Sequence, residues 1–257
     1  MAKVMVTGGA GFIGSHIVDI LLQAGHQVAV LDDLSSGKLE NLPSGQKLYR
    51  LDIRDQTISD AFQEFEADVV VHAAAQISVR VSMENPYLDA HVNVAGIAHI
   101  LQQFPRERLP YVVFISTGGA LYGEQDEFPA SEDHPIRPTS VYGQSKYCSE
   151  LFLDLWRREF GLEYAALRLG NVYGPRQNPH GEAGVVAIFC ERMLHNQEVL
   201  INGSGQQTRD FVYVADVANA VKEVVQRRVS GVFNIGTGKE CSVNHIFEIL
   251  CKDMQLD

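Results

Sequence analysis

Hydrophobic positions in the first half of the chain fall into short runs that are rich in β-branched residues. Nearly every position within a run is apolar, as expected of a strand that is covered on both faces of a sheet. The pattern predicts strands at residues 3–6, 27–31, 47–51, 68–72 and 111–116.

Longer segments with apolar residues at helical spacing separate these runs. They lie at residues 12–25, around 55–66 and near 87–104. Alternation of strands with helices is typical of a parallel sheet that carries helices on both faces. The predicted fold class is therefore α/β, with a doubly wound parallel sheet.

The alternation loosens after about residue 170. Residues 171–184 are predicted to form a loop, followed by a helix near 185–195, and 210–214 starts another strand and helix. We therefore divide the chain into a first domain at 1–170 and a smaller region at 171–257. Within that region, residues 210–236 are expected to return to the first domain.

Composition narrows the range of partners. The 257 residues are 46% hydrophobic, enough for a sizeable core, and the formal net charge is −11. This charge argues against nucleic acid and anionic membranes and favours small-molecule partners. The four cysteines show no CxxC pairing, and the sequence has neither a signal-peptide core nor an apolar run long enough to span a membrane. We therefore predict a reduced, cytoplasmic protein.

A glycine-rich stretch, TGGAGFIG at residues 7–14, joins the first predicted strand to the first helix. Gly8, Gly11 and Gly14 allow a tight turn, a close approach to a pyrophosphate and contact with helix N-terminal amides. Asp32 follows Gly11 by 21 positions, where a carboxylate hydrogen-bonds an adenine ribose. Because it would repel a 2′-phosphate, the pattern favours NAD over NADP.

Two further strand ends fit the same crevice, since ligands of such sheets bind beyond the carboxyl ends of strands. LDIRD places Asp52 and Ile53 near the adenine, and HAAAQ supplies the small side chains of Ala73, Ala74 and Ala75. The pattern predicts a Rossmann-type fold. Helix capping by Asp52 and packing by the alanines are the structural alternatives.

A tyrosine and a lysine, Tyr142 and Lys146, are four residues apart in VYGQSKY (141–147). This spacing places them on one face of a helix, where the ammonium favours a phenolate that can act as a base. The same spacing occurs on surface helices where the tyrosine packs and the lysine is solvated. His180 and Glu182 have no third ligand at useful spacing, so we predict no metal site.

Eight motifs stand in one order: TGGAGFIG, LDDLSSG, DIRD, VVHAAAQ, STGGALYG, YGQSK, RLGNVYGP and RDFVYVADVA. With them the chain resembles the extended short-chain dehydrogenases/reductases that modify nucleotide sugars, most of all the UDP-glucose 4-epimerase branch. The resemblance implies that Tyr142 is the catalytic base and that Lys146 supports it. A hydroxyl of STGG completes the triad; Thr117 is preferred over Ser116.

The resemblance also implies the binding residues. For NAD they are Gly8, Gly11, Phe12, Ile13, Gly14, Asp32, Asp33, Ser36, Gly37, Asp52, Ile53, Ala73, Ala74, Ala75, Asn93, Tyr142 and Lys146. The UDP-sugar is expected to contact Thr117, Asn171 and Arg209, and residues 180–189 to help enclose the nucleotide. A salt bridge between Arg209 and Asp210 is the alternative for that arginine.

Related 4,6-dehydratases carry an acidic pair after the catalytic hydroxyl, where this chain has Gly118 and Gly119. The resemblance therefore implies oxidation at C4, rotation of a 4-keto sugar and return of the hydride to the other face. Another nucleotide-sugar enzyme, such as a decarboxylase or 4-keto reductase, and a noncatalytic NAD-binding regulator are the alternatives.

Assembly and chain length are also implied by the resemblance. Relatives pair the helix near 87–104 and the helix of Tyr142 with their symmetry mates, so we expect a homodimer. Relatives also continue beyond residue 257, so we expect this sequence to be shortened in its substrate-binding part.

Overall fold

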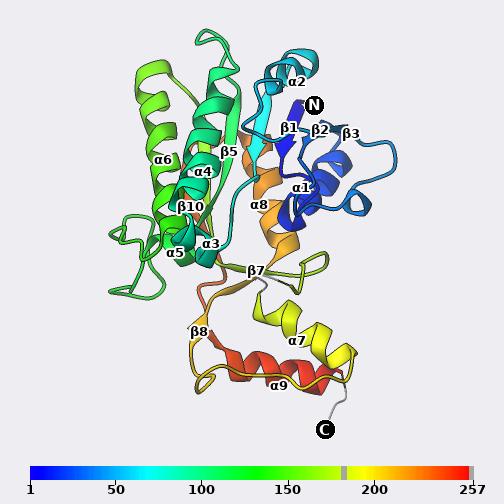
Figure 1. Cartoon of the computed structure of the whole chain (residues 1–257). Coiled ribbons are helices and arrows are strands. Elements are labelled where there is room, and N and C mark those ends of the chain that lie inside the picture. The colour runs from blue at the N-terminus through cyan, green and yellow to red at the C-terminus, as the bar shows by residue number, and fades with distance from the viewer. Residues whose placement is uncertain (181–183, 255–257) are drawn as a thin grey trace.

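A seven-stranded parallel sheet forms the centre of the computed structural model, which describes residues 1–180 and 184–254 (Figure 1). The strand order is β3-β2-β1-β4-β5-β6-β10, and every neighbouring pair is parallel. The strands are β1 (Lys3–Thr7), β2 (Gln27–Leu31), β3 (Lys47–Tyr49), β4 (Val69–His72), β5 (Tyr111–Thr117), β6 (Tyr164–Leu169) and β10 (Gly231–Ile235).

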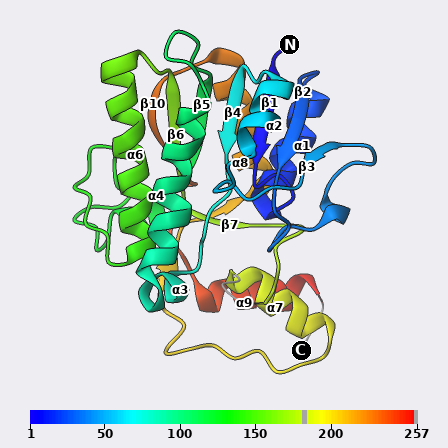
Figure 2. The ribbon, with the colours of Figure 1, turned by 45° about the horizontal axis from the view of Figure 1, so that its top comes forward.

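Helices cover both faces of this sheet, as the sequence predicts (Figure 2). One face carries α1 (Phe12–Gln23) and α8 (Val214–Arg227); the other carries α2 (Ile58–Phe65), α4 (Pro86–Gln102) and α6 (Val141–Phe160). Strand side chains alternate between the faces, so Val4 and Val6 pack in the α1/α8 core while Met5 packs in the α2 core. The predicted α/β class is confirmed.

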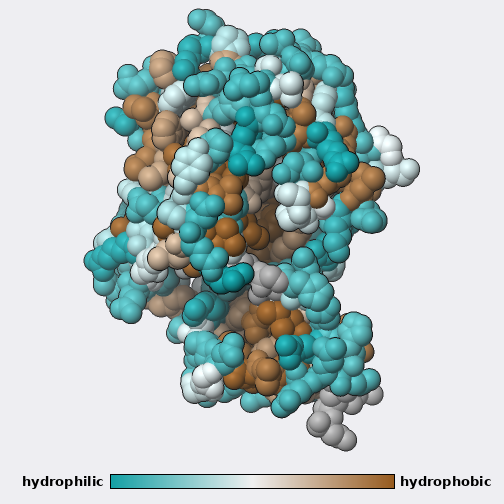
Figure 3. Space-filling view, in the orientation of Figure 1, coloured by the Kyte–Doolittle hydropathy of each residue, from teal (hydrophilic) through white to brown (hydrophobic). Residues whose placement is uncertain are grey.

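A smaller lobe lies beyond one end of the sheet (Figure 1). It contains α7 (Val185–Leu194), α9 (Val243–Asp253) and the antiparallel pair β8 (Thr208–Arg209) and β11 (Cys241–Ser242). Phe189 of α7 packs edge-on against Phe247 of α9, with ring centroids 6.1 Å apart. Apolar side chains gather over this lobe in Figure 3. Residues 214–235, by contrast, return to the main sheet as α8 and β10.

The structure differs from the predicted elements at several places. The third strand ends at Tyr49, two residues before the predicted end, and α2 begins at Ile58. The predicted loop at 171–184 opens with a strand, β7 (Asn171–Tyr173), which pairs in parallel with β9 (Phe211–Tyr213). Because the partner of β7 lies far along the chain, no local periodicity marks it.

Two short helices complete the part of the main body that carries the candidate site. They are α3 (Val79–Glu84), which precedes α4, and α5 (Gly118–Leu121), which follows β5 directly. None of the described helices has the length and apolar character needed to cross a membrane.

Candidate active site

The strand order reverses between β1 and β4, which are neighbours in the sheet. The chain leaves these strands in opposite directions, so a crevice forms at their carboxyl ends. Gly8 follows β1 there, with φ at +69°, and a Cβ on it would lie 2.5 Å from the backbone nitrogen of Ala74 after β4. Only glycine fits this crossing of two backbones.

The start of α1 has the chemistry of an anion site. Gly11 is its N-cap, no side chain caps it, and its first turn carries no acidic residue. The first amides of a helix lack intrahelical acceptors and so present donors to a phosphate. Gly14 is buried, and a Cβ on it would overlap the carbonyl oxygen of Gly8. The turn and helix start therefore fit the pyrophosphate of a dinucleotide.

Asp32 lies next to this turn and is 7% exposed. Its carboxylate accepts hydrogen bonds from the backbone amides of Ala10 and Leu34, each at 2.9 Å. Burial raises the pKa of Asp32, and the two amide bonds lower it. A Cβ on Gly37 would lie 2.9 Å from the same carboxylate. The backbone thus fixes Asp32 while each oxygen retains a lone pair for a ribose hydroxyl.

Other residues predicted to bind the cofactor differ in their surroundings. Asp33 and Ser36 are exposed. Asp52 pairs with Arg54, and hydrogen bonds from that guanidinium lower the pKa of the carboxyl. Ile53 is 5% exposed and packs in the α2 core. The Asp52 carboxylate therefore already has a cation partner, and Ile53 contributes apolar surface.

Asn93 on α4 secures the segment that follows β4. Its Oδ1 accepts from the Gln76 amide and its Nδ2 donates to the Gln76 carbonyl, both at 2.9 Å. Ala73, Ala74 and Ala75, which precede Gln76, are half-buried. Both ends of the Asn93 amide are thus bound to the chain itself, so the structure gives this residue a role in holding the loop.

Asp89 is a residue that the sequence reasoning missed. It lies one turn before Asn93 on α4 and is fully buried. Its Oδ2 accepts from the Gln76 side chain at 2.7 Å, while Oδ1 has no hydrogen-bond partner among the described residues. The sequence offered no clear signal for it, because a polar residue in a helix is buried only by its packing against a distant segment, here the one that contains Gln76.

Tyr142 lies in the first turn of α6, which begins after the N-cap Ser140. The amide of Tyr142 donates to Ser82 Oγ of α3 at 3.1 Å. A Cβ on Gly143 would overlap the carbonyl oxygen of Ala120, so glycine allows α5 and α6 to approach closely. This approach brings the Tyr142 phenol beside the Thr117 hydroxyl at the end of β5, close enough for that hydroxyl to lower the pKa of the phenol.

Ser116 and Thr117 face opposite sides of β5, because successive side chains of a strand alternate. Ser116 is 3% exposed and donates to Glu150 at 2.5 Å. Thr117 caps α5 by accepting from the Ala120 amide at 3.3 Å and also contacts Tyr142. Of the two candidate hydroxyls, only that of Thr117 lies close enough to the phenol to lower its pKa.

The pKa of Tyr142 departs from the expectation. Burial raises it well above the ordinary value, nearby Asp89 adds to the increase, and the adjacent Thr117 hydroxyl only partly offsets both. We expected Lys146 together with a positive nicotinamide ring to lower this pKa; Lys146 is not among the groups that shift it in the protein alone, and for the NAD-bound protein the expectation stays a prediction. Desolvation of a phenolate in the interior outweighs a cation one helical turn away.

Lys146 is directed toward the sheet and is 3% exposed. Its Nζ donates to the Ile115 carbonyl at 2.9 Å and lies 4.7 Å from the centroid of the Phe114 ring. Burial lowers its pKa to about 8, while the carboxylates of Asp89 and Glu150 raise it. The Lys146 ammonium therefore interacts with two buried carboxylates, Asp89 and Glu150, whose proximity the sequence spacing does not reveal.

A cavity of about 300 Å³ opens beside Tyr142. It is lined by Tyr142, Gly170, Asn171, Val172, Tyr173, Gln177, Gly184, Val186 and Phe211. Arg209 is not in this lining; it is exposed and donates to the Thr208 carbonyl at 2.6 Å. A second cavity of about 250 Å³ includes Lys3 and Asp68, at the amino ends of the strands, away from all the motifs. The cavity beside Tyr142 is therefore the candidate substrate site, because it adjoins the predicted catalytic tyrosine and the other cavity adjoins no predicted motif.

The described residues contain no group of three His, Cys, Asp or Glu that could hold a metal ion. His180 pairs with Glu191 at 3.3 Å. Glu182, together with residues 181 and 183 of the predicted nucleotide-enclosing stretch, lies outside the described residues.

Comparison with known proteins gives consistent results. The model of the NAD dependent epimerase/dehydratase family matches residues 4–236. A putative UDP-glucose 4-epimerase of Methanocaldococcus jannaschii is 48% identical over 247 residues, which are 96% of this chain and 81% of that protein. The UDP-glucose 4-epimerase of Mycolicibacterium smegmatis is 43% identical over 250 residues, 95% of this chain and 80% of that protein.

Solved structures agree in fold over nearly the whole chain. The UDP-glucose 4-epimerase of Thermotoga maritima with UDP-glucose has a TM-score of 0.94 and 45% identity, covering 99% of this chain and 83% of that one. The UDP-glucose 4-epimerase of Thermus thermophilus in complex with NAD has a TM-score of 0.93 and 45% identity, covering 99% and 84%.

Proposed function

Because the chain belongs to the NAD-dependent epimerase/dehydratase family, we propose that it inverts C4 of a UDP-hexose and so interconverts UDP-glucose and UDP-galactose. The observation that carries this proposal is the position of the Tyr142 phenol: it lies beside the Thr117 hydroxyl, one turn from Lys146, and beside a cavity at the strand ends. The names of the relatives, UDP-glucose 4-epimerases in both sequence and structure, support the same reaction.

NAD is the cofactor, and the residues at the strand ends fit it. The amides of Phe12 and Ile13 hold the pyrophosphate, and Asp32 accepts the adenine ribose hydroxyls. Ile53 and Ala73–Ala75 line the surface along which the dinucleotide lies, and Lys146 reaches the second ribose. Bound NAD supplies a hydride acceptor and a positive charge at the nicotinamide ring.

Tyr142 handles the proton of the reaction. As the C4 hydrogen leaves as hydride, the phenolate takes the proton of the C4 hydroxyl and a C4 carbonyl forms. After the sugar has turned, hydride returns to the other face of C4 and Tyr142 returns the proton, so no net oxidation occurs. Since burial raises the pKa of Tyr142 in the protein alone, the positive charges of both Lys146 and the ring are needed for the phenolate.

The remaining residues support epimerisation rather than elimination. Thr117 orients the sugar hydroxyl toward the phenol, and Asn171 in the cavity wall contacts the sugar or diphosphate. Arg209 is exposed and serves as the cation for the diphosphate. Gly118 and Gly119 place no acid beside C5 or C6, so a loss of water has no proton donor there.

The experiment is incubation of the purified protein with UDP-galactose without added NAD, followed by chromatography of the nucleotide sugars. We expect UDP-glucose to form without net NADH. A pentose product or net cofactor consumption would support the other nucleotide-sugar reactions, and cofactor occupancy without turnover would support a regulator. UDP-N-acetylgalactosamine assayed in parallel defines the sugar range.

Tyr142→Phe tests the assigned base. General base catalysis contributes about 10²- to 10⁴-fold to rate, so we expect kcat to fall at least about 100-fold while bound NAD is retained. Tyr87→Phe, at an exposed position on α4, is the matched control. Near-normal turnover of the Tyr142 variant would reject the assignment.

A homodimer is part of this proposal. Leu151 and Leu155 on α6 are 49% and 39% exposed, while Leu153 between them is buried in the core. An outward apolar row on α6 supports pairing through this helix and α4. Light scattering of the wild type against Leu151→Glu tests it, a monomeric wild type being the contrary result. We also propose a cytoplasmic, reducing location, supported by four free cysteines.

A further inference from the structure

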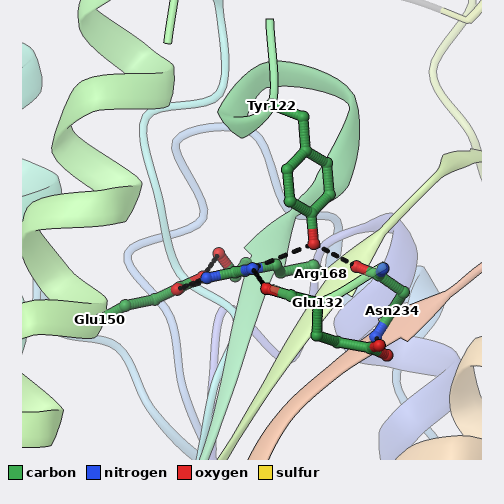
Figure 4. Close-up of polar contacts among 6 residues, drawn as sticks. Tyr122, Glu132, Glu150, Arg168 and Asn234 are labelled. Atoms are coloured by element: carbon green, nitrogen blue, oxygen red, sulfur yellow. Dashed lines mark hydrogen bonds and ion pairs between the residues drawn. The ribbon is translucent and has the colours of Figure 1, made fainter. Parts of the chain in front are cut away.

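A buried ion pair lies on the same face of α6 as Tyr142 and Lys146. Arg168 of β6 donates from Nη2 to Oε2 of Glu150 at 2.7 Å and from Nε to both carboxylate oxygens at 3.2 Å. Each side chain is only 5% exposed. Figure 4 shows the carboxylate of Glu150 meeting the guanidinium of Arg168. Buried charges of this kind require complete pairing.

Further residues complete the hydrogen bonding of the guanidinium. Nη1 of Arg168 donates to Tyr122 Oη and to the Glu132 carbonyl, each at 3.0 Å. The Tyr122 hydroxyl in turn donates to Asn234 Oδ1 of β10 at 2.6 Å (Figure 4). The arginine is therefore fixed by three separate parts of the chain, and it holds the Glu150 carboxylate in one place.

Glu150 connects this pair to the candidate catalytic residues. Three residues of α6, spaced four apart, lie against three consecutive residues of β5, and the second and third are hydrogen-bonded to them. The pairs are Tyr142 with Thr117, Lys146 with Ile115 at 2.9 Å, and Glu150 with Ser116 at 2.5 Å. Of the three α6 residues, only Glu150 also forms an ion pair with another described residue, Arg168.

We propose that Glu150 is a positioning residue for the reaction: its bond to Ser116 fixes α6 along β5 and so sets the Thr117–Tyr142 contact. This inference rests on the proposed function, because it assumes that this contact orients the reacting hydroxyl. Arg168 orients Glu150, and neither touches substrate. A shift of about 1 Å in such a contact can cost about 100-fold in rate.

The charge of Glu150 also affects the pKa of Lys146. A change in the pH profile of activity therefore distinguishes a role in the site from a role in stability alone. The charged groups around Lys146 are Asp89 on α4 and Glu150 on α6, with Arg168 on β6 behind Glu150; His72 on β4 is held neutral by burial. Both carboxylates raise the pKa of Lys146. Removing the Glu150 charge therefore favours loss of the lysine proton at lower pH.

The test compares Ser116→Ala, Glu150→Gln and the exposed control Glu159→Gln on the same helix. Ser116→Ala removes the hydrogen bond between Ser116 and Glu150 but keeps the ion pair of Glu150 with Arg168. We expect kcat for UDP-galactose to fall about 10- to 100-fold, with KM within about threefold and NAD content unchanged. Glu150→Gln should show the same loss, and its activity should decline at a lower pH on the alkaline side. Glu159→Gln should match the wild type.

Normal kcat for Ser116→Ala per folded molecule, with only a lower unfolding midpoint, would overturn the proposal. Ser116→Ala is the decisive variant if Glu150→Gln, which leaves Arg168 without its carboxylate, fails to fold.

Hydrogen exchange of the NAD-bound protein tests the same contact without turnover. We expect Ser116→Ala to accelerate exchange of the amides at both 115–117 and 142–146, and unchanged exchange contradicts the proposal. A wild type that binds NAD but does not convert UDP-galactose refutes the proposed function alone, because the exchange result still decides whether Glu150 sets the position of α6.

Discussion

Replacement of Lys146 by methionine should abolish turnover and yet stabilise the fold. The ammonium is buried, and its pKa in the folded protein is about 8 against an ordinary value of 10.5. That difference corresponds to roughly 3 kcal/mol by which the protonated lysine disfavours folding. Methionine has a similar shape without the charge, so it removes this cost.

Two losses oppose the gain. The Ile115 carbonyl loses the Lys146 donor, and the buried carboxylates of Asp89 and Glu150 lose a nearby positive charge. A lost hydrogen bond costs about 1 kcal/mol, and more when the remaining group is left unsatisfied. The burial term is the larger, so we expect Lys146→Met to be about 1–2 kcal/mol more stable at pH 7.

The pH dependence gives the signature of this mechanism. Below pH 8 lysine is protonated in both the folded and the unfolded wild type, so the advantage of the variant is full and constant. Between pH 8 and 10.5 the folded protein loses the proton first, so the advantage shrinks as pH rises and passes through zero. Above 10.5 only the opposing losses remain, and the variant should be about 1–2 kcal/mol less stable than the wild type.

The assay is urea unfolding of both proteins freed of NAD, at pH values from 6.5 to 10.5, with circular dichroism as the readout. Cofactor must be absent because ligand binding adds its own stabilisation. Lys222→Met, at a partly buried position on α8 outside the site, is the control. A variant that is less stable than wild type at pH 7, or a difference that does not vary with pH, would refute the reasoning.

Three further predictions concern the cofactor crevice. Gly8→Ala should weaken NAD binding, measured by calorimetry, at least about tenfold. The alanine would add left-handed backbone strain of about 1–2 kcal/mol, and its Cβ would overlap the backbone of Ala74. The control is Gly25→Ala, also at positive φ but with nothing within 4 Å of the added Cβ, which should keep the wild-type affinity for NAD. Asp32→Ala removes the acceptor of two backbone amides; NAD affinity should fall about tenfold or more, and unchanged affinity contradicts the ribose contact. His72 has a pKa of about 3 because of burial, so it remains neutral in the fold and costs up to about 1.4 kcal/mol per pH unit below 6.5; His72→Gln should unfold less readily in acid, and identical acid curves would exclude this role.

Much of the fold follows from local pattern. The strands at 3–6, 27–31 and 111–116 and the helices at 12–25 and 87–104 were predicted within a few residues, because period and apolar run length are properties of neighbouring residues. The glycine turn was equally visible, since Gly8 and Gly14 are required by backbone geometry alone. The spacing of Tyr142 and Lys146 likewise follows from the pitch of a helix.

Contacts between segments that are distant along the chain could not be predicted from sequence patterns. The strand β7 has a partner 40 residues away, and the ion pair of Glu150 with Arg168 joins a helix to a strand that was not predicted. Asp89 is a polar residue in a helix until packing against the segment after β4 buries it. In each case the information lies in the partner and not in the local period.

The sequence by itself determined the alternation of strands and helices in the first half of the chain, the dinucleotide turn and the choice of Tyr142 and Lys146 as candidates, because each depends on spacing along a regular backbone. Only the tertiary structure decided that Thr117 rather than Ser116 lies beside the phenol, that Ser116 instead bonds to Glu150, and that burial raises the pKa of Tyr142 while lowering that of Lys146. A pKa depends on desolvation and on charges brought together by folding, and neither exists until the chain has packed.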